Sequence, residues 1–118
     1  MERCFLLILI STPGILSDSI QPKDMEINIY TTEEERVTLS CTYDTGSNYV
    51  YLYWYRQYPN REPEYILFKG ARTWSSEEDI PDTRFQSITS QTSTELIIKS
   101  VTLSDSALYY CALRVTAQ

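Results

Sequence analysis

Apolar and polar residues alternate over several short segments of the chain, as they do in β-strands that bury one face. In residues 37–41 and 107–111 every second side chain points to the same side, and each segment ends in a cysteine, Cys41 or Cys111. Similar patterns predict further strands at residues 20–30, 52–58, 65–68, 84–88 and 95–99, separated by polar turns. The chain is therefore predicted to be all-β, with its strands in two packed sheets.

Cys41 and Cys111 are predicted to form one disulfide between the two sheets, because both face inward from apolar strand faces. Trp54 lies on the next strand after Cys41 and can pack on this disulfide. Tyr109 lies two residues before Cys111 and can turn its ring inward, with its hydroxyl bonded to the backbone just upstream. These four residues form the predicted centre of the core.

With these four residues at matched spacing, residues 19–113 resemble an immunoglobulin variable-type domain, a Greek-key β-sandwich. The segments WYRQ at 54–57 and DSALYYCAL at 105–113 are most similar to those of T-cell receptor alpha or delta variable segments. In that family, the residues at the positions of Arg84 and Asp105 form an ion pair that closes one end of the sandwich. The resemblance implies the same pair here.

A complete domain of this family has one more strand after the second cysteine, opened by a Phe-Gly-x-Gly bulge. Residues 114–118 contain no such motif and are interpreted as the truncated start of the third hypervariable loop. The fold is thus predicted with its last strand missing, which leaves the strand at residues 107–113 with an unpaired edge. In the family, a joining segment added by gene rearrangement supplies that strand.

Residues 1–18 are predicted to be a secretory signal peptide, cleaved between residues 17 and 19, where small residues cluster. Their apolar segment is shorter than the ~20 residues that a membrane-spanning helix needs. Cleavage would remove Cys4 and leave Cys41 and Cys111 as the only possible pair. No second apolar segment follows, so the membrane anchor is expected in a constant region outside this chain.

Charge and composition exclude several classes of function. Sixteen acidic residues against ten basic ones give a net charge of −6, whereas nucleic-acid binding needs a basic surface. The chain has no histidine, which is the commonest general base and a frequent metal ligand. It also lacks a phosphate-binding loop and a zinc-type cysteine cluster. We therefore expect no enzymatic activity, no metal and no cofactor.

The second face of the strand at residues 52–58 carries large amphipathic side chains, Tyr53, Tyr55 and Gln57. Contiguous aromatic surface is rare on monomers, which favours a partner over this face; the alternative is that these are scattered surface tyrosines. In the family, these positions and that of Tyr110 contact the partner variable domain. The implied partner is a T-cell receptor beta-type variable domain.

Ligand recognition is expected in loops that the rigid sandwich holds in place. One loop covers residues 45–51, a second covers residues 69–74, and the third begins after Ala112. Tyrosine, asparagine and arginine, which antigen-binding loops favour, occur in them. The candidate ligand-binding residues are Asn48, Tyr49, Tyr51, Lys69, Arg72, Trp74 and Arg114. Tyr49 and Arg72 are expected to contribute most to binding.

By resemblance, the chain is predicted to be the antigen-recognition variable domain of a T-cell receptor alpha-type chain. It would pass through the secretory pathway to the plasma membrane, bind peptide–MHC, and signal through subunits associated with its constant region. Three alternatives remain open at this point. They are a delta-chain or light-chain variable domain, a non-rearranging innate receptor domain, and an adhesion domain whose outward tyrosines pack on a second copy.

Overall fold

The computed structural model describes residues 2–9, 18–22, 27–32, 36–72 and 77–115. Strands account for most of these residues, and a single 3₁₀ turn is the only helical element among them. The elements are β1 (Glu2–Leu9), β2 (Ser19–Pro22), β3 (Ile27–Thr32), β4 (Val37–Asp44), β5 (Val50–Gln57), β6 (Glu64–Ala71), β7 (Glu78–Asp79), β8 (Phe85–Thr89), β9 (Ser93–Ile98), η1 (Leu103–Asp105) and β10 (Leu108–Val115).

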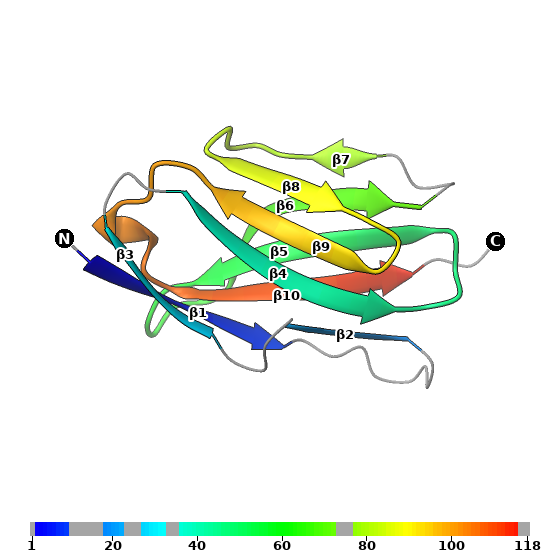
Figure 1. Ribbon diagram of the computed structural model, residues 1–118, viewed down its shortest axis with the longest axis horizontal. Helices are drawn as coiled ribbons and strands as arrows, with labels where there is room; N and C mark the ends of the chain where they lie inside the picture. The colour runs from blue at the N-terminus through cyan, green and yellow to red at the C-terminus, as the bar shows by residue number, and fades with distance from the viewer. Residues whose placement is uncertain (1, 10–17, 23–26, 33–35, 73–76, 116–118) are drawn as a thin grey trace.

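The strands form two sheets packed face to face (Figure 1). One sheet has the strand order β2-β4-β9-β8, and the other has the order β3-β1-β10-β5-β6-β7. The connection from β4 to β5 crosses between the sheets, and so does the connection from β9 through η1 to β10. The predicted all-β sandwich of the immunoglobulin type is therefore confirmed.

The core lies between the sheets because the alternating residues of β4 and β5 turn their apolar side chains inward. Along β4, Val37, Leu39 and Cys41 are buried, and along β5 the buried residues include Leu52 and Trp54. The hydrophobic cluster between the sheets is completed by Ile20, Tyr43, Val50, Ile66, Leu67, Ala71, Phe85, Leu96, Ile98, Val101, Tyr109, Cys111 and Leu113.

The outer edge of β10 is paired in the full chain. β1 pairs with β10 in parallel, from Leu6 opposite Leu108 to Leu9 opposite Cys111, so the unpaired edge stays a prediction for the domain without residues 1–18. Figure 1 shows β1 beside β10, and β3 pairs with the other edge of β1. An open strand edge leaves backbone N–H and C=O groups without partners, and a neighbouring extended segment satisfies them. The predicted removal of residues 1–18 would open this edge.

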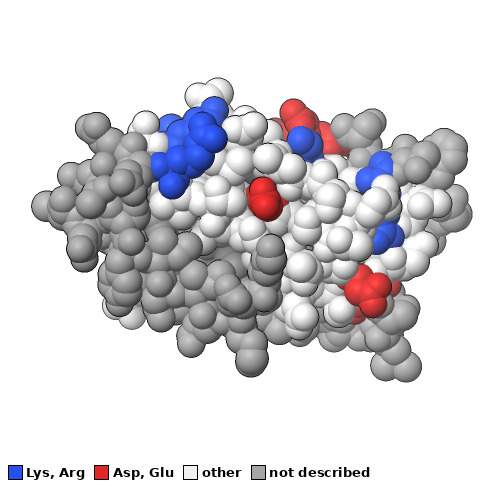
Figure 2. All heavy atoms as spheres, in the orientation of Figure 1, with Lys and Arg blue, Asp and Glu red and all other residues white. Residues whose placement is uncertain are grey.

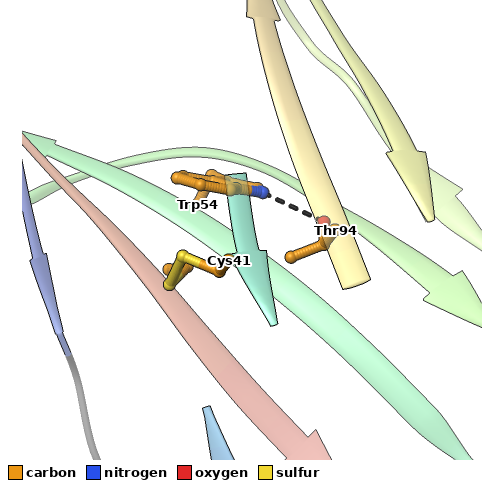
Figure 3. The surroundings of a disulfide bond; sticks show 4 residues. Cys41, Trp54 and Thr94 are labelled. Carbon is orange, nitrogen blue, oxygen red and sulfur yellow. Dashed lines mark hydrogen bonds between the residues drawn. A yellow bond between two sulfur atoms is a disulfide. The ribbon is translucent and has the colours of Figure 1, made fainter. Parts of the chain in front are cut away.

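The predicted disulfide joins Cys41 of β4 to Cys111 of β10 and so links the two sheets. Trp54 lies beside the bridge and donates its indole N–H to the Thr94 hydroxyl of β9 at 3.2 Å (Figure 3). Both Trp54 and Thr94 are fully buried, so this hydrogen bond satisfies polar groups that water does not reach. Bridge, ring and hydroxyl thus connect β4, β5, β9 and β10 across the core.

The Tyr109 side chain holds the corner between η1 and β10 through a hydrogen bond. Its hydroxyl donates to the Asp105 carbonyl at 2.6 Å. Burial, and secondarily the Asp105 charge, raises the pKa of Tyr109 above its ordinary value of 10.0. The protonated Tyr109 hydroxyl therefore stabilises the folded state. Its contribution to the free energy of unfolding is complete below pH 10 and is lost as pH rises towards the folded-state pKa.

Tyr109→Phe is expected to lower the free energy of unfolding by about 1 kcal/mol at neutral pH, through loss of one hydrogen bond. Above pH 10 the original chain should lose stability more steeply than the variant, which has no hydroxyl to ionise at this site. Urea unfolding between pH 7 and 11 measures both effects. Parallel pH curves for the two chains would contradict the assignment.

Candidate functional site

A buried ionic group closes one end of the sandwich, next to η1. Arg84 Nη2 lies 2.5 Å from Asp105 Oδ2, and Asp105 is only 1% exposed. The same carboxylate oxygen accepts the Thr102 backbone N–H at 2.8 Å, and Arg56 Nη1 lies 3.9 Å from Oδ1. Arg56 also packs over the Tyr58 ring at 4.9 Å from its centroid. The structure thus brings Arg84 and Asp105 together and adds Arg56, which the sequence analysis did not single out.

A continuous aromatic surface covers the outward side of β5 and β6. It consists of Tyr51, Tyr53, Tyr55, Tyr65 and Phe68, and is called the aromatic face below. The Tyr53 ring stacks on Phe68 with 5.2 Å between centroids, and Tyr55 meets the edge of Tyr65 at 6.1 Å. The β5 members are half-buried, and Tyr65 is 41% exposed. Five rings connected by a chain of contacts form a surface patch, in contrast to scattered tyrosines.

Tyr65 and Phe68 share this face although they are three residues apart, and a strand without irregularity would place them on opposite sides. The pairing of β5 with β6 shifts between Trp54 and Tyr55, so that Ile66 is an extra residue in β6. Ile66 and Leu67 are consequently both buried. This β-bulge turns Tyr65 outward beside Tyr55. Alternation alone does not reveal it.

Gln57 and Tyr110 extend the aromatic face towards one end of the sheet. The Tyr110 hydroxyl donates to Gln57 Oε1, and Gln57 Nε2 donates to the Arg61 carbonyl at 2.8 Å. At the opposite end, the Arg114 guanidinium donates to the Tyr53 hydroxyl at 2.9 Å. The four predicted partner-interface residues, Tyr53, Tyr55, Gln57 and Tyr110, therefore belong to one surface on β5 and β10.

Three residues predicted in ligand-binding loops lie on strands instead. Tyr51 is on β5, Lys69 is on β6 and Arg114 is on β10. Lys69 pairs with Leu52 of β5 and Glu78 of β7, and its ammonium donates to the Ser87 carbonyl at 3.1 Å and lies 3.8 Å from the Glu78 carboxylate. The turn cluster at residues 45–48 favoured a loop up to Tyr51, and resemblance placed Arg114 in the third loop, but ladder pairing extends each strand past the predicted boundary. Trp74 lies outside the described residues.

The first loop is compact at residues 45–49. The Ser47 hydroxyl accepts the Tyr49 backbone N–H at 2.9 Å, and the Thr45 hydroxyl accepts the Ser47 N–H at 3.3 Å. Asn48 is exposed at its tip and Tyr49 is half-buried. Arg72, the first residue after β6, reaches this loop with its guanidinium, which donates to the Thr45 and Ser47 carbonyls at 2.6 and 2.9 Å.

Charged side chains of both signs lie on the described surface of the domain. On the face seen in Figure 2, acidic and basic side chains form small groups among uncharged ones, and one acidic group lies next to a basic side chain. Within the described part of the chain, no group of three or more His, Cys, Asp or Glu side chains could hold a metal ion. No helix in that part is long and apolar enough to cross a membrane.

Comparison with known proteins identifies relatives over nearly the whole chain. The model of the immunoglobulin V-set domain matches residues 25–118. Human T cell receptor alpha variable 18 is 43% identical over 112 residues, which cover 92% of this chain and 90% of the relative. Human T cell receptor alpha variable 3 is 33% identical over 117 residues, 92% of each chain. Human T cell receptor alpha variable 14/delta variable 4 is 33% identical over 103 residues, 86% of this chain and 84% of the relative.

Proposed function

The chain belongs to the immunoglobulin V-set family, and from that premise we propose that it is the antigen-recognition variable domain of a T-cell receptor alpha-type chain. The observation that carries the proposal is its similarity, across nearly its whole length, to human T cell receptor alpha variable segments. One of these relatives is also named as a delta variable segment, so a delta-type chain is the second candidate. Family members of this kind recognise ligands and are not enzymes.

The aromatic face is proposed as the contact with a beta-type variable domain. Rings that are half-buried in the single chain still offer apolar area, and interface cores are enriched in such aromatic residues. Gln57 and Tyr110 lie beside the rings and hold each other through a hydrogen bond, so their side chains are ordered before a partner arrives. Ordering in advance lowers the entropy cost of association.

The proposed ligand is a peptide–MHC complex, bound by the loops next to this interface. Asn48 is exposed and Tyr49 half-buried at the compact first loop, which makes them the proposed direct contacts. A variable domain of this kind would act at the plasma membrane, in a receptor whose constant region carries the anchor and meets the signalling subunits. Residues 1–18 would direct export and then be removed.

Gln57→Arg is expected to weaken assembly with a beta-type chain at least tenfold, because it places an unpaired charge in a surface that the partner covers. Gln86→Arg is the matched control, since Gln86 is exposed on β8 in the other sheet. Sedimentation of the co-expressed chains measures the heterodimer fraction. The interface assignment fails if Gln57→Arg assembles as well as Gln86→Arg while both variants are folded.

A further inference from the structure

All three guanidinium nitrogens of Arg72 donate hydrogen bonds to other parts of the same domain. Nη1 donates to the carbonyls of Thr45 and Ser47, while Nε and Nη2 both donate to the Gln91 carbonyl, at 3.1 and 2.5 Å. All three nitrogens are therefore engaged by backbone oxygens. A ligand carboxylate would have to compete with these hydrogen bonds.

The same side chain also packs on an aromatic ring. The guanidinium carbon lies 5.1 Å from the centroid of Tyr43, within the range of a cation–π contact. The Tyr43 hydroxyl in turn donates to the Ser90 carbonyl at 2.5 Å. Arg72 and Tyr43 thus both reach the turn at residues 90–93 that joins β8 to β9, while Arg72 alone also holds the first loop.

The backbone conformation of Arg72 is a second, independent observation that points to a structural role for its side chain. Its φ is 71°, in the left-handed region that residues other than glycine seldom adopt. Glycine would fit this position without strain, but glycine has no side chain to reach the three carbonyls. The arginine is held in this conformation by the hydrogen bonds of its own side chain.

We propose that Arg72 is a positioning residue that fastens the first loop, residues 45–49, to the turn at residues 90–93. The inference deepens the proposed function, because it gives Arg72 a role in shaping the recognition surface instead of touching the ligand. It also makes the 90–93 turn part of the same rigid surface as the first loop. Both segments lie at the end of the sandwich where β4 ends and β5 begins, and where Ser93 pairs with Thr42 of β4.

Hydrogen exchange of backbone amides in the full chain, without any ligand, tests this role. The reporters are the amides of Ser47 and Tyr49 in the loop and of Thr92 and Ser93 in the turn, which all donate to side-chain oxygens in their own segment. Amides of β4 that pair with β9 report the stability of the whole domain.

Arg72→Gly is expected to accelerate exchange at the loop and turn reporters at least tenfold, because several hydrogen bonds are lost together, while β4 amides keep their protection. Arg72→Lys should give an intermediate acceleration, since lysine keeps the charge but lacks the planar fork that reaches three carbonyls. Arg61→Gly removes an exposed arginine from a distant turn and should change neither set of reporters.

Unchanged exchange at the reporters in Arg72→Gly would overturn the proposal, and so would equal acceleration in the loop and in β4. If Arg72→Gly does not fold, the same comparison is made with Arg72→Lys. Because no ligand or partner is used, the outcome is independent of whether the chain recognises peptide–MHC. Failure of the beta-chain assembly test and failure of this one are therefore distinguishable.

Discussion

Replacing Cys41 and Cys111 together by alanine is expected to lower the free energy of unfolding by about 4 kcal/mol, from the loop entropy of a bridge with a sequence separation of 70. Single domains are stable by only about 5–15 kcal/mol, so the loss is a large share of the total. The bridge joins β4 to β10 under the fully buried Trp54, and its removal also leaves a gap in the core. Denaturant unfolding followed by circular dichroism measures the change.

Thr38→Ala is the matched control, since it changes an exposed residue of β4 but leaves the Cys41–Cys111 bridge intact. Its midpoint should stay close to that of the original chain. A difference of only about 1 kcal/mol between the free energies of unfolding of the double variant and the original chain would be well below the chain-entropy expectation. In that case the bridge is not a main source of stability.

Asp105→Ala is expected to destabilise the domain by about 3–5 kcal/mol, the range for breaking a buried ion pair from one side. The carboxylate is 1% exposed and faces both Arg84 and Arg56. Without it, Arg84 loses its carboxylate partner, and Arg56 keeps the exposed Glu64 at 3.3 Å. The Thr102 N–H that opens η1 also loses its acceptor. Equilibrium unfolding in urea measures the loss.

The two sides of this pair are not equivalent, which gives the experiment its control. The Arg84 side chain is 38% exposed, so water can replace part of what it loses. Arg84→Ala also leaves Asp105 with Arg56 and Thr102 as partners. Its expected cost is about 1.5–3 kcal/mol, the range for one hydrogen bond to a charged group. A larger loss for Arg84→Ala than for Asp105→Ala would refute this account of the closed end.

The fold could be predicted from the sequence because its main determinants act locally. Alternation assigns one face of a strand to the core, and this placed Val37, Leu39 and Cys41 correctly on β4. Trp54 and Tyr109 followed from their spacing to the two cysteines, and each is fully buried with its polar atom hydrogen-bonded. Such signals need no knowledge of distant partners.

Other features depend on pairing that the sequence does not display. The bulge at Ile66 decides which face Tyr65 takes, and it arises only when β6 is aligned with β5. Lys69 was predicted to open the loop at residues 69–74, and Arg114 was placed in the third loop by resemblance, although ladder pairing keeps both on strands. Arg72 is a residue type that often binds ligands, yet its hydrogen-bond partners are backbone carbonyls distant in the sequence. Long side chains find such partners only in the folded domain.

The most direct test of the central claim is to sequence transcripts from lymphoid tissue that contain the codons for Cys41 to Trp54, reading past Cys111. A T-cell receptor alpha-type variable domain predicts many different junctions after Ala112, each leading into a Phe-Gly-x-Gly strand and one shared constant region. A single invariant continuation in all transcripts would contradict antigen recognition by a rearranged receptor. It would favour an innate or adhesive domain of the same fold.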